Sequence, residues 1–296
     1  MKNLRLFCFI GFVLLVSGTT QLRANPILEV INIDSILARH DVGNALGLAF
    51  RADFQKDMIY LGHGSDALGS FIYTLDDHGN FINELDFGAA YSSSNVINSL
   101  NYDRSSKHLW VSTTVIVGSD YTDHFVEIDP STAKIYNDLQ IDHLDSAYVR
   151  NDGIWTTLFE EDVIRHYDLN GVFIGDISVA DIFPGFPGPS GLASAPDGGF
   201  YIIDHFGQRI VEIDIAGHEI GVASTAFLGG RAFAIDSDID THRIFLQVGN
   251  DEIYVLSTEF ITAVPEADTW VMLLVGLGFV GMAVKRQRKR VWIRYA

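Results

Sequence analysis

The stretch PSGLASAPDGGFYIIDHFGQRIVEIDIAGHEI, Pro189 to Ile220, holds the clearest structural unit of the chain. In its second half, Glu212 and Asp214 alternate with Val211 and Ile213, which is the period-two pattern of a strand with one packed face. Gly, Asp and Pro residues separate the apolar runs and are typical of tight turns. We expect strands at 191–193, 200–203 and 209–213, with a fourth after the turn at 214–217.

The same unit recurs along the chain. The second residues of the five first strands are spaced by 41 to 52 residues, and they are Leu48, Leu100, Tyr148, Leu192 and Phe233. An aromatic residue lies in each second strand: Tyr60, Trp110, Trp155, Tyr201 and Phe245. A period of about 40 to 50 residues with four strands in each copy is the sequence signature of a β-propeller.

The fold class predicted is therefore all-β, with a single propeller at residues 25–263. Five four-stranded blades fit the five copies, and six blades are the alternative. The blades are expected near 44–92, 96–143, 145–186, 189–228 and 231–262. The last copy supplies only three strands, so the strand at 27–33 is expected to pair with it, which would close the ring and remove an exposed edge.

Four short motifs stand out in the blade that begins at Pro189. They are Pro-x-Gly-Leu-Ala at 189–193, Asp-Gly at 197–198, Tyr-Ile-Ile-Asp at 201–204 and Gln-Arg-Ile at 208–210. The blade resembles NHL-type and SMP-30-like propeller repeats, whereas the other four blades match loosely. The resemblance implies kinship to a group of binding scaffolds, lactonases, peptide lyases and strictosidine synthase-like proteins. Such breadth does not select a function.

The N-terminus has the order of a secretory signal peptide. Lys2 and Arg5 precede an apolar run from Leu6 to Val16, and small and polar residues follow up to Ala24. The run of 11 residues is too short to span a hydrocarbon core of about 30 Å. We therefore expect a signal helix within 1–24, cleaved after Ala24, and an uncleaved anchor is the alternative.

Charge is distributed unevenly. The body carries 36 of the 38 acidic residues but only 11 of the 20 Lys and Arg residues. Such a surface repels phosphate backbones, so nucleic acid is excluded as a partner. The one cysteine, Cys8, lies in the predicted signal peptide, so the mature protein would have no disulfide.

The C-terminal stretch is VPEADTWVMLLVGLGFVGMAVKRQRKR, Val264 to Arg290. Trp270 to Val284 is a run of 15 residues without charge, about 23 Å long as a helix. The basic cluster behind it would stay in the cytoplasm. We expect a transmembrane helix at 269–284, with the propeller outside the cytoplasm.

This tripartite pattern resembles the PEP-CTERM sorting signal of Gram-negative bacteria. The residues that carry it are Val264, Pro265, Glu266, Thr269, Trp270, Lys285, Arg286, Arg288, Lys289 and Arg290. Ala267 replaces the usual second proline, and six residues follow the cluster. The resemblance implies that an exosortase in the inner membrane cleaves near the Pro-Glu pair within 264–296 and delivers the protein to the envelope or surface, commonly in makers of exopolysaccharide. An ordinary membrane anchor is the alternative.

Propellers bind ligands through the loops at the ends of the central channel. The candidates just ahead of the inner strands are Asn44, Asn98, Asp145, Ser190 and Arg231. In metal-dependent relatives, Ca²⁺ lies in this channel on oxygen ligands, which Asn44, Asn98 and Asp145 could supply. The alternative is that these residues bond only to neighbouring backbone. Asp76, Asp129, Asp168 and Asp214 end the third strands, where Asp most often caps a turn.

No GxSxG, P-loop or HExxH motif is present in the sequence. The favoured hypothesis is an exported, non-catalytic propeller of the envelope or matrix that binds polysaccharide or protein. The second hypothesis is an exported NHL-type hydrolase, lactonase or lyase with a channel cation. An extracytoplasmic sensor is a third, although no signalling domain follows the C-terminal helix.

Overall fold

The computed structural model describes residues 26–39, 47–51, 57–65, 69–92, 95–141, 145–158, 161–183, 189–204, 206–249 and 251–263. The predicted signal peptide at 1–24 and the predicted transmembrane helix at 269–284 lie outside these residues. Within the described ranges, no helix is long and apolar enough to cross a membrane. The chain divides into two compact units, Met1–Thr262 and Ala263–Ala296.

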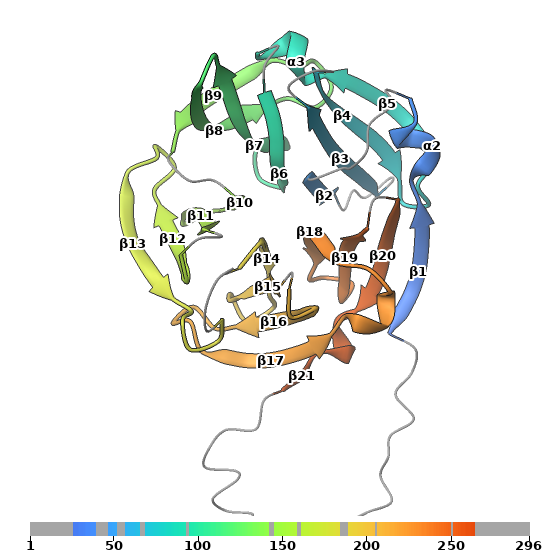
Figure 1. Cartoon of the computed structure of the whole chain (residues 1–296), viewed down its shortest axis with the longest axis vertical. Helices are drawn as coiled ribbons and strands as arrows, with labels where there is room; N and C mark the ends of the chain where they lie inside the picture. Colours follow the sequence, from blue (N-terminus) through green and yellow to red (C-terminus); the bar gives the residue numbers. More distant parts are fainter. Residues whose placement is uncertain are drawn as a thin grey trace, which may run out of the picture. The chain divides into compact units, whose positions relative to one another are not determined.

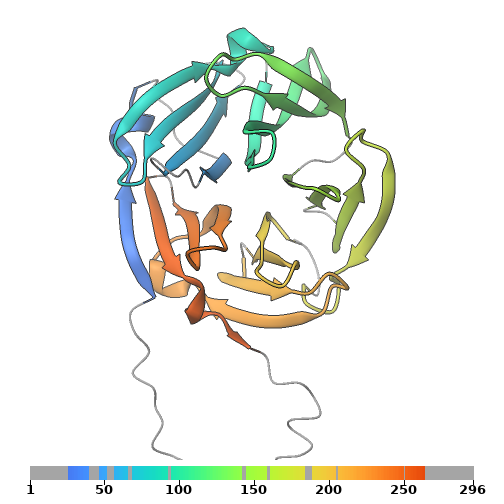
Figure 2. The same cartoon turned by 180° about the vertical axis from the view of Figure 1, so that it is seen from behind.

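The body is a ring of five antiparallel sheets around a central axis (Figure 1, and from behind in Figure 2). Blade 1 comprises β2 (Gly47–Arg51), β3 (Met58–Ser65), β4 (Gly69–Asp76) and β5 (Phe81–Asp86). Blade 2 comprises β6 (Asn95–Asp103), β7 (His108–Val117), β8 (Asp120–Ile128) and β9 (Ile135–Gln140). Blade 3 comprises β10 (Ser146–Arg150), β11 (Gly153–Leu158), β12 (Val163–Tyr167) and β13 (Phe173–Ser178).

Blade 4 comprises β14 (Gly191–Ser194), β15 (Phe200–Asp204), β16 (Arg209–Ile213) and β17 (Glu219–Ser224), with β21 (Thr262–Ala263) as a fifth strand. Blade 5 comprises β18 (Ala232–Asp238), β19 (Arg243–Val248) and β20 (Glu252–Ser257), and its outer strand is β1 (Ile27–Asn32). Four short helices complete the described elements: α2 (Asp34–Leu37), α3 (Phe87–Ala90), η1 (Ala226–Leu228) and η2 (Thr258–Phe260). The prediction of five four-stranded blades is confirmed, and the added strand β21 was not predicted.

The hydrophobic core lies between neighbouring blades. One cluster joins Leu48 and Leu61 of blade 1 to Phe245 and Ile253 of blade 5. The five aromatic residues of the second strands are at most 5% exposed, and they are Tyr60, Trp110, Trp155, Tyr201 and Phe245. Burial of one such side chain contributes about 1.5–3 kcal/mol. The aromatic repeat in the sequence therefore marks the junctions of the blades.

The turns between the third and fourth strands are capped by aspartate. Asp76 accepts hydrogen bonds from the backbone N–H groups of His78 and Asn80, at 3.1 and 2.8 Å. Asp168, Asp214 and Asp129 bond backbone amides of their own turns in the same way. The capping role predicted for these residues is confirmed.

These turns also join successive blades. Gly79 has a φ of +81°, and a Cβ added there would lie 2.1 Å from Cγ2 of Ile31 on β1. Gly217 of blade 4 lies in the same way against Ile177 on β13 of blade 3. Glycine is needed here both for the left-handed backbone and for the close approach. The turns of blades 1 and 4 therefore rest on the outer strand of the preceding blade.

Replacing Gly79 with alanine tests this contact. We expect G79A to lower the free energy of unfolding by about 2–5 kcal/mol, because left-handed strain of about 1–2 kcal/mol is added to a steric clash with Ile31. The matched control is G118A, since Gly118 has a φ of +66° with nothing within 4 Å of the added Cβ. Chemical unfolding of both variants should show the larger loss in G79A. Equal losses would mean that the turn does not press on β1.

Candidate functional site

The channel has two ends with different residues. The inner strands of the blades are β2, β6, β10, β14 and β18. At one end of the channel, the chain leaves each inner strand and turns into the second strand of the same blade. We call this end the inner-turn face. We name the opposite end, where the chain enters each inner strand, the mouth. The mouth also carries the turns between second and third strands.

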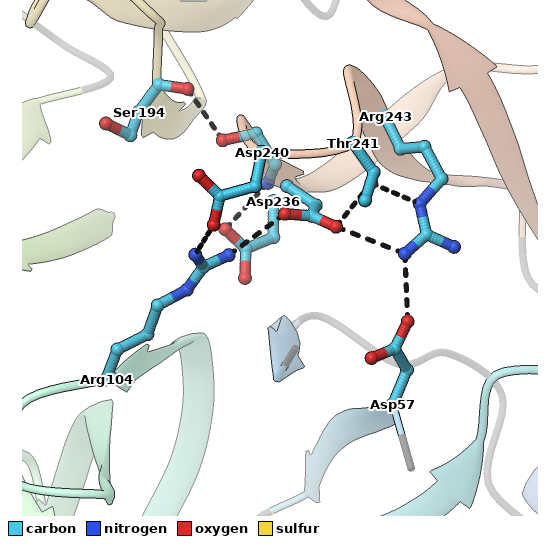
Figure 3. Close-up of polar contacts among 9 residues, drawn as sticks. Asp57, Arg104, Ser194, Asp236, Asp240, Thr241 and Arg243 are labelled. Atoms are coloured by element: carbon cyan, nitrogen blue, oxygen red, sulfur yellow. Dashed lines mark hydrogen bonds and ion pairs between the residues drawn. The ribbon is translucent and has the colours of Figure 1, made fainter. Parts of the chain in front are cut away.

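A buried carboxylate organises the inner-turn face (Figure 3). Asp238 ends β18 and is 0% exposed. One of its oxygens accepts a hydrogen bond from Arg104 at 3.2 Å, and the other accepts from Arg243 at 3.1 Å. The hydroxyl of Thr241 also donates to Asp238. Two guanidinium groups and a hydroxyl thus compensate the desolvation of one negative charge.

The arginines extend this network to other blades. Arg104 follows β6 in blade 2, and it also donates to Asp240 of blade 5 at 2.8 Å. Blades 2 and 5 are not neighbours in the ring, so the side chain of Arg104 crosses the inner-turn face. Arg243 of blade 5 donates to Asp57 of blade 1 at 2.9 Å. Together these ion pairs hold three blades in a fixed arrangement.

A second set of polar groups lies next to this network. Ser237 of β18 donates to the carbonyl oxygen of Ser194 on β14 at 2.6 Å. The Tyr148 hydroxyl of β10 interacts with Ser194 and with Asn101 of β6. Burial raises the pKa of Tyr148, and the nearby Asp236 carboxylate raises it further. With Asp57, these contacts bring polar side chains of all five blades into one region, which we call the five-blade network.

The charge state of Asp238 follows from its surroundings. Burial alone would raise its pKa, but hydrogen bonds from Thr241, Arg243 and Arg104, with the positive charge of Arg104, hold the pKa below the usual value for Asp. Asp238 is therefore ionised at neutral pH. The arrangement is suited to bracing the ring, because the Asp238 carboxylate accepts hydrogen bonds from Arg104, Arg243 and Thr241 and is satisfied by protein groups alone.

At the mouth, the residues predicted from the sequence have separate environments. Asn98 donates to the hydroxyl of Thr114 at 2.9 Å, and Thr114 donates to Asp123 at 2.7 Å. The Ser190 hydroxyl donates to the carbonyl oxygen of Ile203 at 3.3 Å. Asn98 and Ser190 thus bond within their own blades.

Asp145 and Asn44 are two further residues that the sequence predicts at the mouth. Asp145 is exposed, just ahead of β10, and Asn44 lies outside the described residues. Within the residues that the structure describes, no group of three or more His, Cys, Asp or Glu side chains could hold a metal ion. Amide oxygens such as those of Asn44 and Asn98 are not among these groups, so the channel cation stays a prediction.

Arg231 has a partner that the sequence did not indicate. Its guanidinium carbon lies 4.6 Å from the ring centroid of Phe206. Phe206 lies in the turn between β15 and β16 and is 50% exposed, and Arg231 precedes β18 and is also exposed. The pair forms an exposed aromatic and cationic surface at the mouth. In the sequence, the only signal was an apolar residue in the short His-Phe-Gly turn.

A family model described as the PEP-CTERM protein-sorting motif matches residues 263–289. The chain carries a PEP-CTERM tail. The motif implies export, processing by an exosortase, and anchoring or cleavage at the C-terminus. The prediction of this motif from Val264–Arg290 is confirmed, and the roles of its individual residues stay predictions. No curated protein matches the chain significantly.

Several solved structures are similar to the body. A protein of unknown function from Bacteroides caccae has 9% identity and a TM-score of 0.46, covering 68% of this chain and 69% of that one. A streptogramin B lyase has 12% identity and a TM-score of 0.48, covering 81% and 88%. A protein assigned to the gluconolactonases has 11% identity and a TM-score of 0.47, covering 71% and 73%. At this level of similarity, the comparisons carry no assignment of activity to this chain.

The five-blade network predicts unequal roles for two aspartates that bond the same arginine. We expect D238N to lower the free energy of unfolding by about 2–3 kcal/mol at pH 7, because Arg104 and Arg243 lose a buried partner. D240N is the matched control, since Asp240 is 73% exposed and its pair with Arg104 is worth less than about 1 kcal/mol. Urea unfolding measures both losses. Equal losses in D238N and D240N would show that the buried position of Asp238 adds nothing to the stability that its ion pairs provide.

The stability difference between wild type and D238N is also expected to depend on pH. The pKa of Asp238 is lower in the folded state than in the unfolded state, so its contribution is complete above the unfolded value of about 3.9. The contribution is lost as the pH falls through the lower folded pKa. The stability difference between wild type and D238N should therefore shrink below about pH 4. A difference that stays constant down to pH 2.5 would contradict this assignment.

Proposed function

We propose that the protein is an exported, non-catalytic propeller of the cell envelope or surface that binds polysaccharide at its mouth. The observation that carries the proposal is the exposed Phe206–Arg231 pair at that end of the channel. The PEP-CTERM tail supports the location, because it implies export and sorting. Binding of an envelope protein at the same surface is the alternative, and wild-type protein that does not bind the exopolysaccharide in the test below would favour it.

The pair has the chemistry that sugars require. The face of an aromatic ring offers an apolar surface to the C–H groups of a pyranose, and the guanidinium offers several fixed N–H donors to its hydroxyl oxygens. Both groups are carried by short connections between strands, which limits the conformational entropy lost on binding. The five-blade network at the other end braces the ring and supports a preorganised mouth.

The charge of the body favours one class of polysaccharide. The body has a large excess of acidic residues, which repels a strongly anionic polymer at long range. We propose a neutral or weakly charged exopolysaccharide of the producing bacterium as the ligand. Its contact would then depend on stacking and hydrogen bonds, and would be only weakly sensitive to salt.

The proposed route uses both ends of the chain. A signal peptide at 1–24 would start export, and a helix at 269–284 would hold the propeller outside the cytoplasm until an exosortase in the inner membrane cleaves near Pro265–Glu266. The product would then be released to the cell surface or matrix.

The second candidate is an exported hydrolase, lactonase or lyase of the NHL type that uses a channel cation. The observation that favours it is the exposed Asp145 at the mouth, just ahead of β10, with Asn98 in the first half of the neighbouring inner strand β6. Asn98 is held by Thr114, so its amide is already oriented within blade 2. Together with Asn44, these two residues are the proposed oxygen ligands.

Polysaccharide binding is tested with the exopolysaccharide purified from the producing bacterium. We expect F206A to weaken the binding of the protein about tenfold, because the stacking surface is lost. F173A is the matched control, since Phe173 on β13 is similarly exposed at 54% but lies away from the mouth. Calorimetry or surface plasmon resonance measures both affinities. Unchanged affinity of F206A would refute the proposed contact.

The cation hypothesis is tested by thermal unfolding. For the binding propeller, we expect the same midpoint in EDTA and in 5 mM Ca²⁺, Mg²⁺, Mn²⁺ or Zn²⁺. An ion at a hundred times its dissociation constant would add about 2.7 kcal/mol to the stability and raise the midpoint by a few degrees. The D145N variant is the control for any shift. A shift with Ca²⁺ that D145N abolishes would favour the enzyme hypothesis.

A further inference from the structure

The junction between blades 4 and 5 differs from the other junctions. In blades 1, 3 and 4, the turn between the third and the fourth strand rests on the preceding blade, as Gly171 of blade 3 does against Leu139 on β9. Blade 5 has no such turn, because its third strand β20 is followed by the C-terminal segment and its outer strand is β1. Residues 258–263, which we call the connector, take the place of the missing turn. They comprise η2, Ile261 and β21.

The connector is held at both of its ends. Its first residue, Thr258, donates its backbone N–H to the carbonyl oxygen of His242 at 2.9 Å. At the other end, β21 pairs with β17 as the fifth strand of blade 4. The connector is therefore tethered to the ring, and its last two residues extend the sheet of blade 4.

Side chains of the connector pack on the rim of blade 4. Ile261 lies directly on the backbone of β17, since a Cβ added to Gly221 would be 2.7 Å from its Cγ2. The ring of Phe260 meets that of Phe227 edge to face, with centroids 6.4 Å apart. Phe260 and Ile261 also contact the core cluster shared by blades 4 and 5. These contacts give the connector a defined position.

The end of this pairing coincides with the start of the sorting motif. The motif begins at residue 263, and β21 is Thr262–Ala263. The proposed cleavage near Pro265–Glu266 lies two or three residues farther on, which is at most about 11 Å of extended chain. A peptidase that binds its substrate as an extended segment needs residues on both sides of the scissile bond. The paired residues of β21 would fall within that segment.

We infer that the connector restrains the start of the sorting motif on blade 4, so that the exosortase must detach β21 from β17 before it cleaves. The inference rests on the proposed processing of the PEP-CTERM tail. It is independent of the Phe206–Arg231 surface, so loss of polysaccharide binding would not affect it. Processing is limited by the opening of one short strand, while the rest of the ring stays folded.

The first test weakens the connector. In pulse–chase labelling of the full chain in the producing bacterium, we expect I261A to shorten the half-life of the unprocessed form at least twofold. The matched control is I174A, because Ile174 is an isoleucine on the outer strand β13 of blade 3 and is 55% exposed. Hydrogen exchange of the purified full chain in detergent should show faster exchange in the connector of I261A and unchanged exchange in β18 and β19.

The second test leaves the pairing intact. Insertion of Gly-Ser-Gly-Ser between Ala263 and Val264 moves the motif away from blade 4. We expect the half-life of the unprocessed form to shorten as in I261A, whereas hydrogen exchange in the connector stays as slow as in the wild type. The proposal is overturned if the inserted spacer leaves the half-life unchanged, or if I261A loses protection without faster processing. A wild-type C-terminus that stays at Ala296, read from the intact mass, would overturn it together with the proposed processing. Normal binding to exopolysaccharide in that case would leave the proposed ligand surface standing.

Discussion

The closure of the ring is the constraint on which the rest of the structure depends. Strand β1 pairs with β20 along its length, from Ile27 opposite Leu256 to Asn32 opposite Glu252. Without this pairing, blade 5 would have three strands and an open edge, and the cluster between blades 5 and 1 would lose the buried side chain of Ile31. Because β1 comes from the start of the body and β20 from its end, the ring can close only when the whole body has been made.

Closure also makes the five-blade network stable. Burial of Asp238 is favourable only if Arg104 and Arg243 reach it, and these residues come from blades 2 and 5. Ring closure fixes the distance between the blades, so only the entropy of the arginine side chains is lost when the charges meet. In return, the network favours one arrangement of the inner-turn face. A ring in which blade 2 is displaced would leave Asp238 without the positive charge of Arg104, which disfavours such states.

In this arrangement, the two ends of the channel and the outer rim carry different groups. The inner-turn face is occupied by ion pairs that brace the ring, whereas the mouth carries the exposed Phe206 and Arg231. The rim of blade 4 holds the connector that leads to the sorting tail. The proposed binding surface and the connector therefore lie on different parts of the ring, and a change in one is not expected to disturb the other.

The sequence by itself determined the five blades, the aromatic core positions, the aspartate caps and the sorting motif, because each depends on residues close together in the chain. Period-two patterns and Asp-Gly turns depend only on neighbouring residues, so the sequence alone places Tyr201 in a second strand and Asp214 at the end of a third strand. Only the tertiary structure decided the five-blade network, the Arg231–Phe206 contact and the fifth strand β21. Arg104 and Asp238 are 134 residues apart, and nothing in a local pattern relates them. They meet because the ring closes, and ring closure is a property of all five blades together.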